Sequence, residues 1–223
     1  MNITLTGIDE LTDFGDIRAL LTRGAELGIL YTETPEGRHR YPSIKWMVEL
    51  FRAVPGRYAL HVCGRAARAH LLAGDRPMLT MPVQRIQING IVGDDEIYHA
   101  CTLFRDWKII TQSHSGNSVN IGCENHQVLV DGSGGRGISP GVWVRPTTPR
   151  DVGFAGGLGP HNLADQLPRI SDMACDPWWV DMEGRLRDSQ DWFSSAAALA
   201  ALDVFDTHTA QPGRSSDVPE NHS

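Results

Sequence analysis

Short apolar runs alternate with amphipathic stretches along almost the whole chain. The runs are rich in Ile, Leu, Val, Tyr and Trp, and turn-forming residues flank them, as expected for buried strands. Eight strands are predicted: Ile3–Gly7, Leu27–Thr32, Tyr58–Cys63, Arg85–Asn89, Lys108–Ser113, Gln127–Asp131, Asp151–Ala155 and Trp178–Asp181. Strands that alternate with helices pair in parallel through crossover connections. Eight such units predict an α/β protein of the (β/α)8 TIM barrel class.

The stretches between the strands have the apolar spacing of helices. Over Leu11–Arg23, apolar residues recur at spacings of three and four. Ser43 precedes a second such stretch and can cap it, and Pro160 suits the first turn of another, where no amide is needed. The later helices are expected at Ser43–Val54, Arg65–Ala73, Asp94–Arg105, Pro160–Ile170 and Asp188–Phe205.

Two connections depart from this pattern. Gly116–Asn125 is too polar and glycine-rich to predict a helix, and Gly132–Arg150 is rich in glycine and proline. We interpret the second as a functional loop, with one barrel helix lost or shortened. The barrel is expected to occupy residues 1–207, followed by a polar, disordered tail over residues 208–223.

Composition and charge narrow the function classes. The 223 residues are 41% hydrophobic and 21% charged, as in ordinary globular proteins. The net charge of -7 disfavours nucleic-acid binding, and neither a membrane span nor a secretory leader is predicted. The cysteines form no CxxC pair, and the potential metal ligands have no recognised spacing, so we expect reduced thiols in a cytoplasmic protein without metal or cofactor. These cysteines are Cys63, Cys101, Cys123 and Cys175.

The strongest local signal follows the seventh predicted strand. Gly156 and Gly157 come directly after this strand and shortly before a helix. Glycines let the backbone approach an anion closely, and the free amides of a helix N-terminus favour negative charge. The pair therefore indicates either a phosphate site or an ordinary strand-to-helix turn.

A second signal follows the sixth strand, where Asp131 precedes the glycine-rich segment Gly132–Gly137. A carboxyl group at a strand end can act as a general acid if burial favours its protonated form. The loop behind it can close over a ligand. The alternative is an aspartate that merely orders the loop.

Several motifs together resemble the phosphoribosylanthranilate isomerase family of tryptophan biosynthesis. The family's AGGL-x-P-x-N motif after strand seven is similar to Ala155–Asn162, and its LLD…GGTG segment is similar to Leu129–Gly137. Its QLHG, VDV, SPR and ICGI motifs are similar to Ile86–Gly90, Val180–Met182, Thr34–Arg38 and Leu5–Ile8. The order and spacing agree over most of the chain.

The resemblance implies a TIM barrel that catalyses an Amadori rearrangement of a phosphorylated aminosugar, an aldose–ketose isomerisation. Asp131 would be the general acid that opens the sugar ring. Arg38 or its neighbour Arg40 would hold the carboxylate of the substrate, because a guanidinium matches a planar carboxylate. The remaining site residues implied are Gly156 and Gly157 for phosphate, and Gln87, Asn89 and Asp181 for the rest of the substrate.

The chain departs from the family at three positions. The family's catalytic base is the cysteine of ICGI, where this chain has Thr6, and a hydroxyl is far too weak an acid to supply a base unaided. The phosphate-binding SSG after strand eight is replaced by Met182-Glu183-Gly184, and the histidine of QLHG by Asn89. These changes leave open a second function class, a noncatalytic barrel that binds a phosphorylated or acidic small molecule.

Cys63 offers one replacement for the missing base. Ala59, His61 and Cys63 share a face of the third predicted strand, because side chains alternate along a strand. If that face points into the barrel, Cys63 reaches the rim, and its thiol can act as a base given a lowered pKa. The alternative is a small buried hydrophobic residue above a core histidine.

Overall fold

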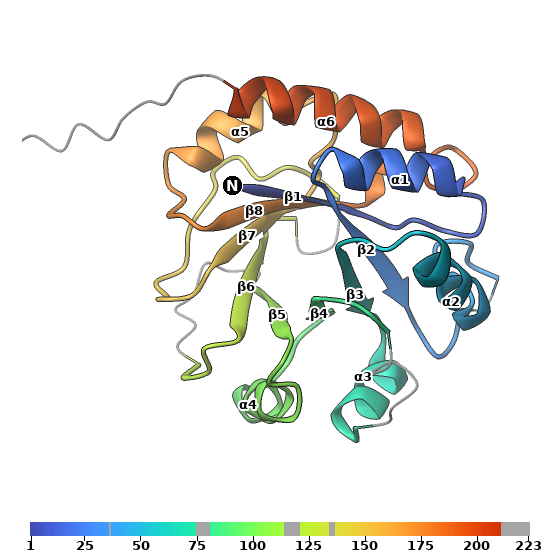
Figure 1. The fold of residues 1–223 in the computed structure, drawn as a ribbon. Coiled ribbons are helices and arrows are strands. Elements are labelled where there is room, and N and C mark those ends of the chain that lie inside the picture. Colours follow the sequence, from blue (N-terminus) through green and yellow to red (C-terminus); the bar gives the residue numbers. More distant parts are fainter. Residues whose placement is uncertain (36, 75–80, 114–120, 134–136, 211–223) are drawn as a thin grey trace, which may run out of the picture.

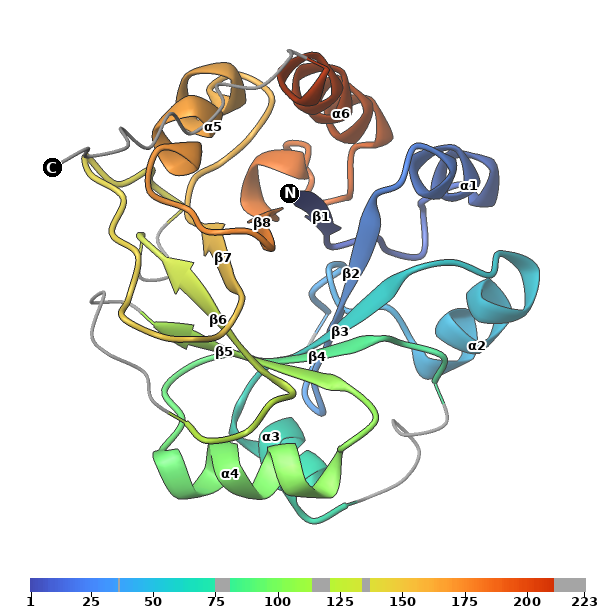
Figure 2. The same ribbon diagram turned by 60° about the vertical axis from the view of Figure 1, so that its left-hand side comes forward.

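The structure is a computed structural model that describes residues 1–35, 37–74, 81–113, 121–133 and 137–210. Within these ranges, eight parallel strands pair in sequence order and close into a barrel, with β1 beside β8 (Figures 1 and 2). The strands are β1 (Asn2–Thr6), β2 (Glu26–Tyr31), β3 (Tyr58–Val62), β4 (Arg85–Ile88), β5 (Lys108–Ser113), β6 (His126–Asp131), β7 (Val152–Ala155) and β8 (Trp178–Met182). The predicted (β/α)8 barrel is confirmed.

The helices of the described ranges surround the barrel, as Figure 2 shows in a view close to its axis. They are α1 (Phe14–Thr22), α2 (Ile44–Ala53), α3 (Arg65–Leu72), α4 (Asp94–Leu103), α5 (Leu163–Ser171) and α6 (Ser195–Thr209), with the short 3-10 helix η2 (Gly184–Leu186) after β8. Ser43 caps α2 as predicted, since its side chain accepts a bond from the amide of Trp46. No helix in these ranges is long and apolar enough to cross a membrane.

Several helix boundaries differ from prediction: α1 begins at Phe14 rather than Leu11, and further differences occur in the last two helices. The last helix begins at Ser195 rather than Asp188, because the Ser194 side chain caps it by accepting a bond from the amide of Ala197. It continues to Thr209, two residues past the predicted end of the barrel at 207. Pro160 lies in a turn ahead of α5 rather than in its first helical turn.

The irregular connections carry no helix in their described parts, residues 121–125 and 137–151. This agrees with the prediction that one barrel helix is lost or shortened. Residues 114–120 and 134–136 of these connections lie outside the described residues, as do residues 211–223 of the predicted tail. The barrel wall is therefore covered unevenly, with β5 and β6 less covered by described helices than β1 to β4.

Side chains point alternately outward and inward along each strand, so they form one layer outside the barrel wall and one inside it. Outward residues such as Ile3, Leu60 and Phe154 pack with the helices in one large apolar cluster. Inward residues form a smaller cluster inside the barrel, made by Ile110, Leu129 and Trp179 with Ala155 packed against it. This inner apolar layer fills the middle of the barrel and leaves polar inward residues above and below it.

The amino-terminal end of the barrel is closed by a buried ion pair. The Arg85 guanidinium lies against the Glu26 carboxylate, donates to Thr4 Oγ1 at 2.8 Å and stacks 4.5 Å from the Trp179 ring centre. Only 2% of the Glu26 side chain is exposed. Because each charge here is surrounded by partners, we interpret this end of the barrel as structural. The open end lies at the carboxyl termini of the strands.

Gly153→Ala is expected to destabilise the fold. A Cβ at this position would lie 2.1 Å from Cε2 of Trp179, whose ring is held beneath Arg85. Overpacking of this kind costs about 1–3 kcal/mol, measurable as a lower urea midpoint. At Gly141 a Cβ would meet no atom within 4 Å. Gly141→Ala should leave the midpoint unchanged, and equal effects of the two changes would contradict this packing.

Candidate active site

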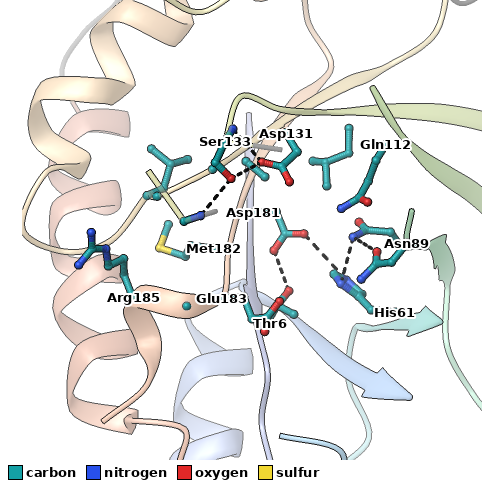
Figure 3. Close-up of a pocket in the computed structure, with 18 of the residues that line it drawn as sticks. Thr6, His61, Asn89, Gln112, Asp131, Ser133, Asp181, Met182, Glu183 and Arg185 are labelled. Carbon is teal, nitrogen blue, oxygen red and sulfur yellow. Dashed lines mark hydrogen bonds and ion pairs between the residues drawn. The ribbon is translucent and has the colours of Figure 1, made fainter. Parts of the chain in front are cut away.

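A cavity of about 440 Å3 opens at the carboxyl ends of the strands. Its lining is mostly polar (Figure 3). It comes from β1, β3, β4, β5, β6, β7 and β8, from segments that follow these strands and, through Arg40, from the segment after β2. The predicted site residues that line it are Thr6, Arg40, Gln87, Asn89, Asp131, Gly156, Gly157 and Asp181. Of the other predicted residues, Arg38 and Cys63 are not among those lining the cavity.

Asp131 and the diglycine turn meet, as the sequence predicted. A Cβ at Gly156 would lie 3.1 Å from Asp131 Oδ1 and 2.8 Å from the amide nitrogen of Ser133. Asp131 is 6% exposed, and its Oδ1 accepts bonds from the Ser133 hydroxyl at 2.7 Å and the Ser133 amide at 3.0 Å. Glycine is needed here because any side chain would collide with the carboxyl group and its loop.

The side chain of Asn162 braces the turn after β7. Its Nδ2 donates to the carbonyl of Gly157 at 2.9 Å, and its Oδ1 accepts from the amide of Gly159 at 3.0 Å. The Ser139 hydroxyl donates to the same Gly157 carbonyl at 3.1 Å. Gly157 has a φ of +63°, so its backbone adopts a left-handed conformation. These contacts hold the backbone of Gly156 and Gly157 at the cavity wall.

Asp181 projects into the cavity from β8, across from Asp131 (Figure 3). Its Oδ1 accepts a bond from the Thr6 hydroxyl at 2.7 Å, and its Oδ2 lies 3.9 Å from Nε2 of His61. Burial raises the pKa of Asp181 to about 7, and the bond from Thr6 opposes this rise. Near pH 7 this carboxyl group is therefore able both to take up and to release a proton.

A chain of polar side chains runs from His61 to the rim. His61 Nδ1 lies 3.2 Å from Gln87 Nε2, which also donates to Asn89 Oδ1 at 2.8 Å. Asn89 Nδ2 in turn donates to Cys63 Sγ at 3.2 Å. Burial lowers the pKa of His61 to about 3, so the imidazole is neutral. His61 on β3 therefore points into the barrel, which was the condition set for this face of the strand.

The condition under which Cys63 can act as a base is not met. Burial raises the pKa of its thiol to about 12, and the Glu183 charge raises it further. Cys63 donates weakly to the carbonyl of His61, 3.4 Å away. The prediction required a lowered pKa, and no cation close to the sulfur outweighs its burial.

Of the two arginines proposed for carboxylate binding, Arg40 lines the cavity. Its Nη1 donates to Glu183 Oε1 at 2.9 Å, and its other nitrogens bind Asp191. Arg38 is exposed and donates instead to the carbonyls of Thr34 and Pro35. The guanidinium of Arg40 is thus held at the mouth, and its charge offsets the Glu183 carboxylate that replaces the family's SSG.

Three polar lining residues that sequence reasoning did not single out are Gln112, Ser133 and Arg185. Gln112 lies two positions after the inward Ile110 on β5, so strand alternation could have identified it. Ser133 is 3% exposed and binds Asp131, but no sequence pattern marks it. Arg185 follows β8 in η2, and a Cβ at Gly159 would lie 2.5 Å from its Cβ. Arg185 therefore borders the turn that carries the diglycine.

Groups of three or more His, Cys, Asp or Glu side chains arranged to hold a metal ion were sought in the described ranges, and none occurs there. The donor set of the cavity is instead amide, hydroxyl and carboxyl groups with two nearby guanidinium groups. Such a set suits a polar, anionic organic molecule of modest size.

The structure is a closed (β/α)8 barrel with a polar cavity at the carboxyl ends of its strands, and solved structures share this fold. TrpF from Jonesia denitrificans aligns with a TM-score of 0.71 at 20% identity, covering 95% of this chain and 100% of that chain. Phosphoribosyl anthranilate isomerase from Thermus thermophilus aligns at 0.66 and 19% identity, covering 93% and 100%. A phosphoribosyl anthranilate isomerase in complex with reduced 1-(o-carboxyphenylamino)-1-deoxyribulose 5-phosphate aligns at 0.63 and 13%, covering 93% and 99%.

No protein-family model matches the chain, and no curated protein matches it. The solved structures establish that this chain has the phosphoribosylanthranilate isomerase-like barrel fold, as the motif resemblance implied.

Proposed function

We propose that the protein isomerises a phosphorylated aminosugar of the phosphoribosylanthranilate type. The observation that carries the proposal is the meeting of Asp131 with the Gly156–Gly157 turn in one cavity at the carboxyl ends of the strands. An acid beside an anion-binding turn is the arrangement that ring opening of a sugar phosphate needs. The sugar-phosphate analogue bound to one structural neighbour supports a small phosphorylated ligand.

Each group has a defined task in this reaction. Asp131, as the general acid, gives a proton to the ring oxygen, the bond from C1 to that oxygen breaks, and the nitrogen lone pair forms a protonated Schiff base. Gln87 and Asn89 bind sugar hydroxyls, and the amides of Gly156 and Gly157 bind the phosphate. Arg40 or Arg38 pairs with the substrate carboxylate; of the two, Arg40 has its guanidinium at the cavity.

The direct test is turnover of phosphoribosylanthranilate, followed as loss of its fluorescence. The proposal predicts loss that is first order in the purified protein and saturates with substrate. Fluorescence that decays no faster than in buffer would contradict the isomerase function.

One observation favours a second function, a noncatalytic binder: Thr6 stands where the family has its catalytic base. In that case sugar phosphates would raise the melting temperature of the protein, and fluorescence would not decay. No stabilisation by phosphate or sugar phosphates at millimolar concentration would count against both functions. Location in the cytoplasm, predicted from the cysteines, is part of either proposal.

Arg185→Ala is expected to weaken phosphate binding. Arg185 is exposed, lines the cavity and forms no ion pair within the described residues, so its charge is available to an anion beside Gly157. Loss of one charge-assisted bond should raise KM by about ten-fold and change kcat little. Arg52 is exposed in the last turn of α2, so Arg52→Ala is the matched control. An unchanged KM in the Arg185 variant would remove Arg185 from the phosphate site.

A further inference from the structure

Removal of the C2 proton of the Schiff base requires a base that Thr6 does not provide. We infer that Asp181 is this general base and that the Thr6 hydroxyl positions its carboxylate. The inference rests on the proposed isomerase function, and it goes beyond the substrate-orienting role that the resemblance implies for Asp181.

Strand register places the carboxyl groups of Asp131 and Asp181 on opposite sides of Ala155. Asp131 on β6 pairs with Ala155 on β7, and Ala155 pairs with Asp181 on β8. Neighbouring strands lie about 4.8 Å apart, so the two Cα atoms are separated by about 10 Å, and the tilt of barrel strands places Asp131 nearer the mouth than Asp181. Both side chains line the cavity, with the small Ala155 between them. A sugar above Ala155 would therefore have Asp131 on one side and Asp181 on the other.

The contacts of Asp181 suit a base rather than a structural carboxylate. Asp181 is 5% exposed and has one hydrogen bond of normal length among the described residues, from Thr6 at 2.7 Å. Its second oxygen, Oδ2, faces His61 Nε2 at 3.9 Å, too far for a hydrogen bond. A fully paired carboxylate would be a poor base, whereas this carboxyl group keeps basic capacity on the cavity side.

His61 presents a donor to that second oxygen. Gln87 Nε2 donates to Asn89, which identifies it as the amide nitrogen, so His61 Nδ1 beside it must be the acceptor. This assigns the proton of the neutral imidazole to Nε2. His61 Nε2 is buried and has no hydrogen-bond partner in the described part of the chain. At 3.9 Å it does not occupy Oδ2 of Asp181, so this oxygen stays available to accept a proton.

The charged groups around Asp181 hold its pKa near neutrality. Burial raises this pKa to about 7, Glu26 on β2 and Asp131 on β6 add to the rise, and Thr6 and Arg85 oppose it. His61 on β3 is neutral. A base with a pKa close to the working pH combines a useful ionised fraction with adequate basicity.

The proton balance of the step is complete. Ionised Asp181 takes the C2 proton, the electrons of that bond form a C1–C2 double bond, and the nitrogen becomes a neutral amine. The resulting enol then gains a proton at C1 and loses its hydroxyl proton, giving the ketone. Asp181 returns its proton to C1, and the ionised Asp131 accepts the enol proton, so both groups regain their initial state without any co-reactant.

Asp181→Asn tests the inference, because it keeps the shape of the side chain and removes the base. We expect kcat to fall by about 10²–10⁴-fold with KM within about three-fold of wild type, and hydrogen exchange at C2 with deuterium oxide to stop. A role in orienting substrate would instead raise KM and leave exchange in place. If wild type turns over substrate and Asp181→Asn does so within three-fold, the inference fails and the isomerase function stands.

Thr6→Val tests the positioning role of Thr6 through the pH dependence of kcat/KM, which a purely structural role would leave unchanged. The base must be ionised, so activity should be lost as pH falls through about 7. Removing the Thr6 bond disfavours the carboxylate, and the acid limb of kcat/KM should move to higher pH by about one unit. The same titration can be followed by carbon NMR of labelled aspartate, with Asp181→Asn identifying the signal. A titration of Asp181 below pH 5 would overturn the inference even if no substrate is turned over.

Discussion

Asp131→Asn is expected to lower kcat for isomerisation by about 10²–10⁴-fold, the usual contribution of a general acid. The amide cannot give a proton to the ring oxygen, so the sugar stays closed and the Schiff base does not form. The carboxyl group lies against the Gly156 turn and accepts two bonds from Ser133. Because Asn still accepts at Oδ1, the loop should remain in place and KM should change little.

The matched control for this prediction is Asp95→Asn, an equivalent change at an exposed position in the first turn of α4. It should retain wild-type kcat. Steady-state kinetics from the fluorescence assay measure both variants, and circular dichroism shows whether they fold alike. A kcat of Asp131→Asn within three-fold of wild type would assign ring opening to another group.

Arg85→Met is expected to lower the free energy of unfolding by about 3 kcal/mol or more, because it leaves a carboxylate buried without its cation. The Glu26 side chain is 2% exposed and the Arg85 side chain 12%. Methionine retains the apolar contact with Trp179 but offers no donor to Glu26 or Thr4. Urea unfolding followed by tryptophan fluorescence measures the change.

A double-mutant cycle separates the ion pair from packing. Glu26→Gln with Arg85→Met removes both charges, so the double variant should be more stable than Arg85→Met alone. Arg57 lies at the same end of the barrel but is exposed, and Arg57→Met should change stability by less than about 0.5 kcal/mol. Additive effects of Glu26→Gln and Arg85→Met would contradict a coupled buried pair.

The fold could be predicted from sequence because barrel strands are short, apolar and evenly separated by amphipathic helices. Strand positions such as Lys108–Ser113 agree with the structure residue for residue. Boundaries were less predictable where a cap decides them: nothing in the apolar spacing shows that Ser194, rather than a residue near Asp188, starts the last helix. The path of the long β6–β7 connection depends on contacts such as Trp143 with Gln166, which sequence spacing does not encode.

The cavity lining was predictable for several residues at strand ends, because alternation and the parallel sheet fix the direction of their side chains; Cys63 is an exception. This holds for Asp131, Asn89 and Asp181. It fails in loops: Arg38 and Arg40 are two residues apart, and only the ion pairs of Arg40 with Glu183 and Asp191 explain which one reaches the mouth. The raised pKa of Cys63 likewise follows from burial and from the neighbouring Glu183 carboxylate, which lies in the segment after β8.

A crystal structure with reduced 1-(o-carboxyphenylamino)-1-deoxyribulose 5-phosphate tests the central claim most directly, since it shows where each part of the ligand binds. The account predicts the phosphate on the backbone of Gly156 and Gly157 near Arg185, the sugar chain between Asp131 and Asp181, and the carboxylate beside Arg40. A ligand bound with its phosphate away from the diglycine turn, or outside this mouth of the barrel, would contradict it.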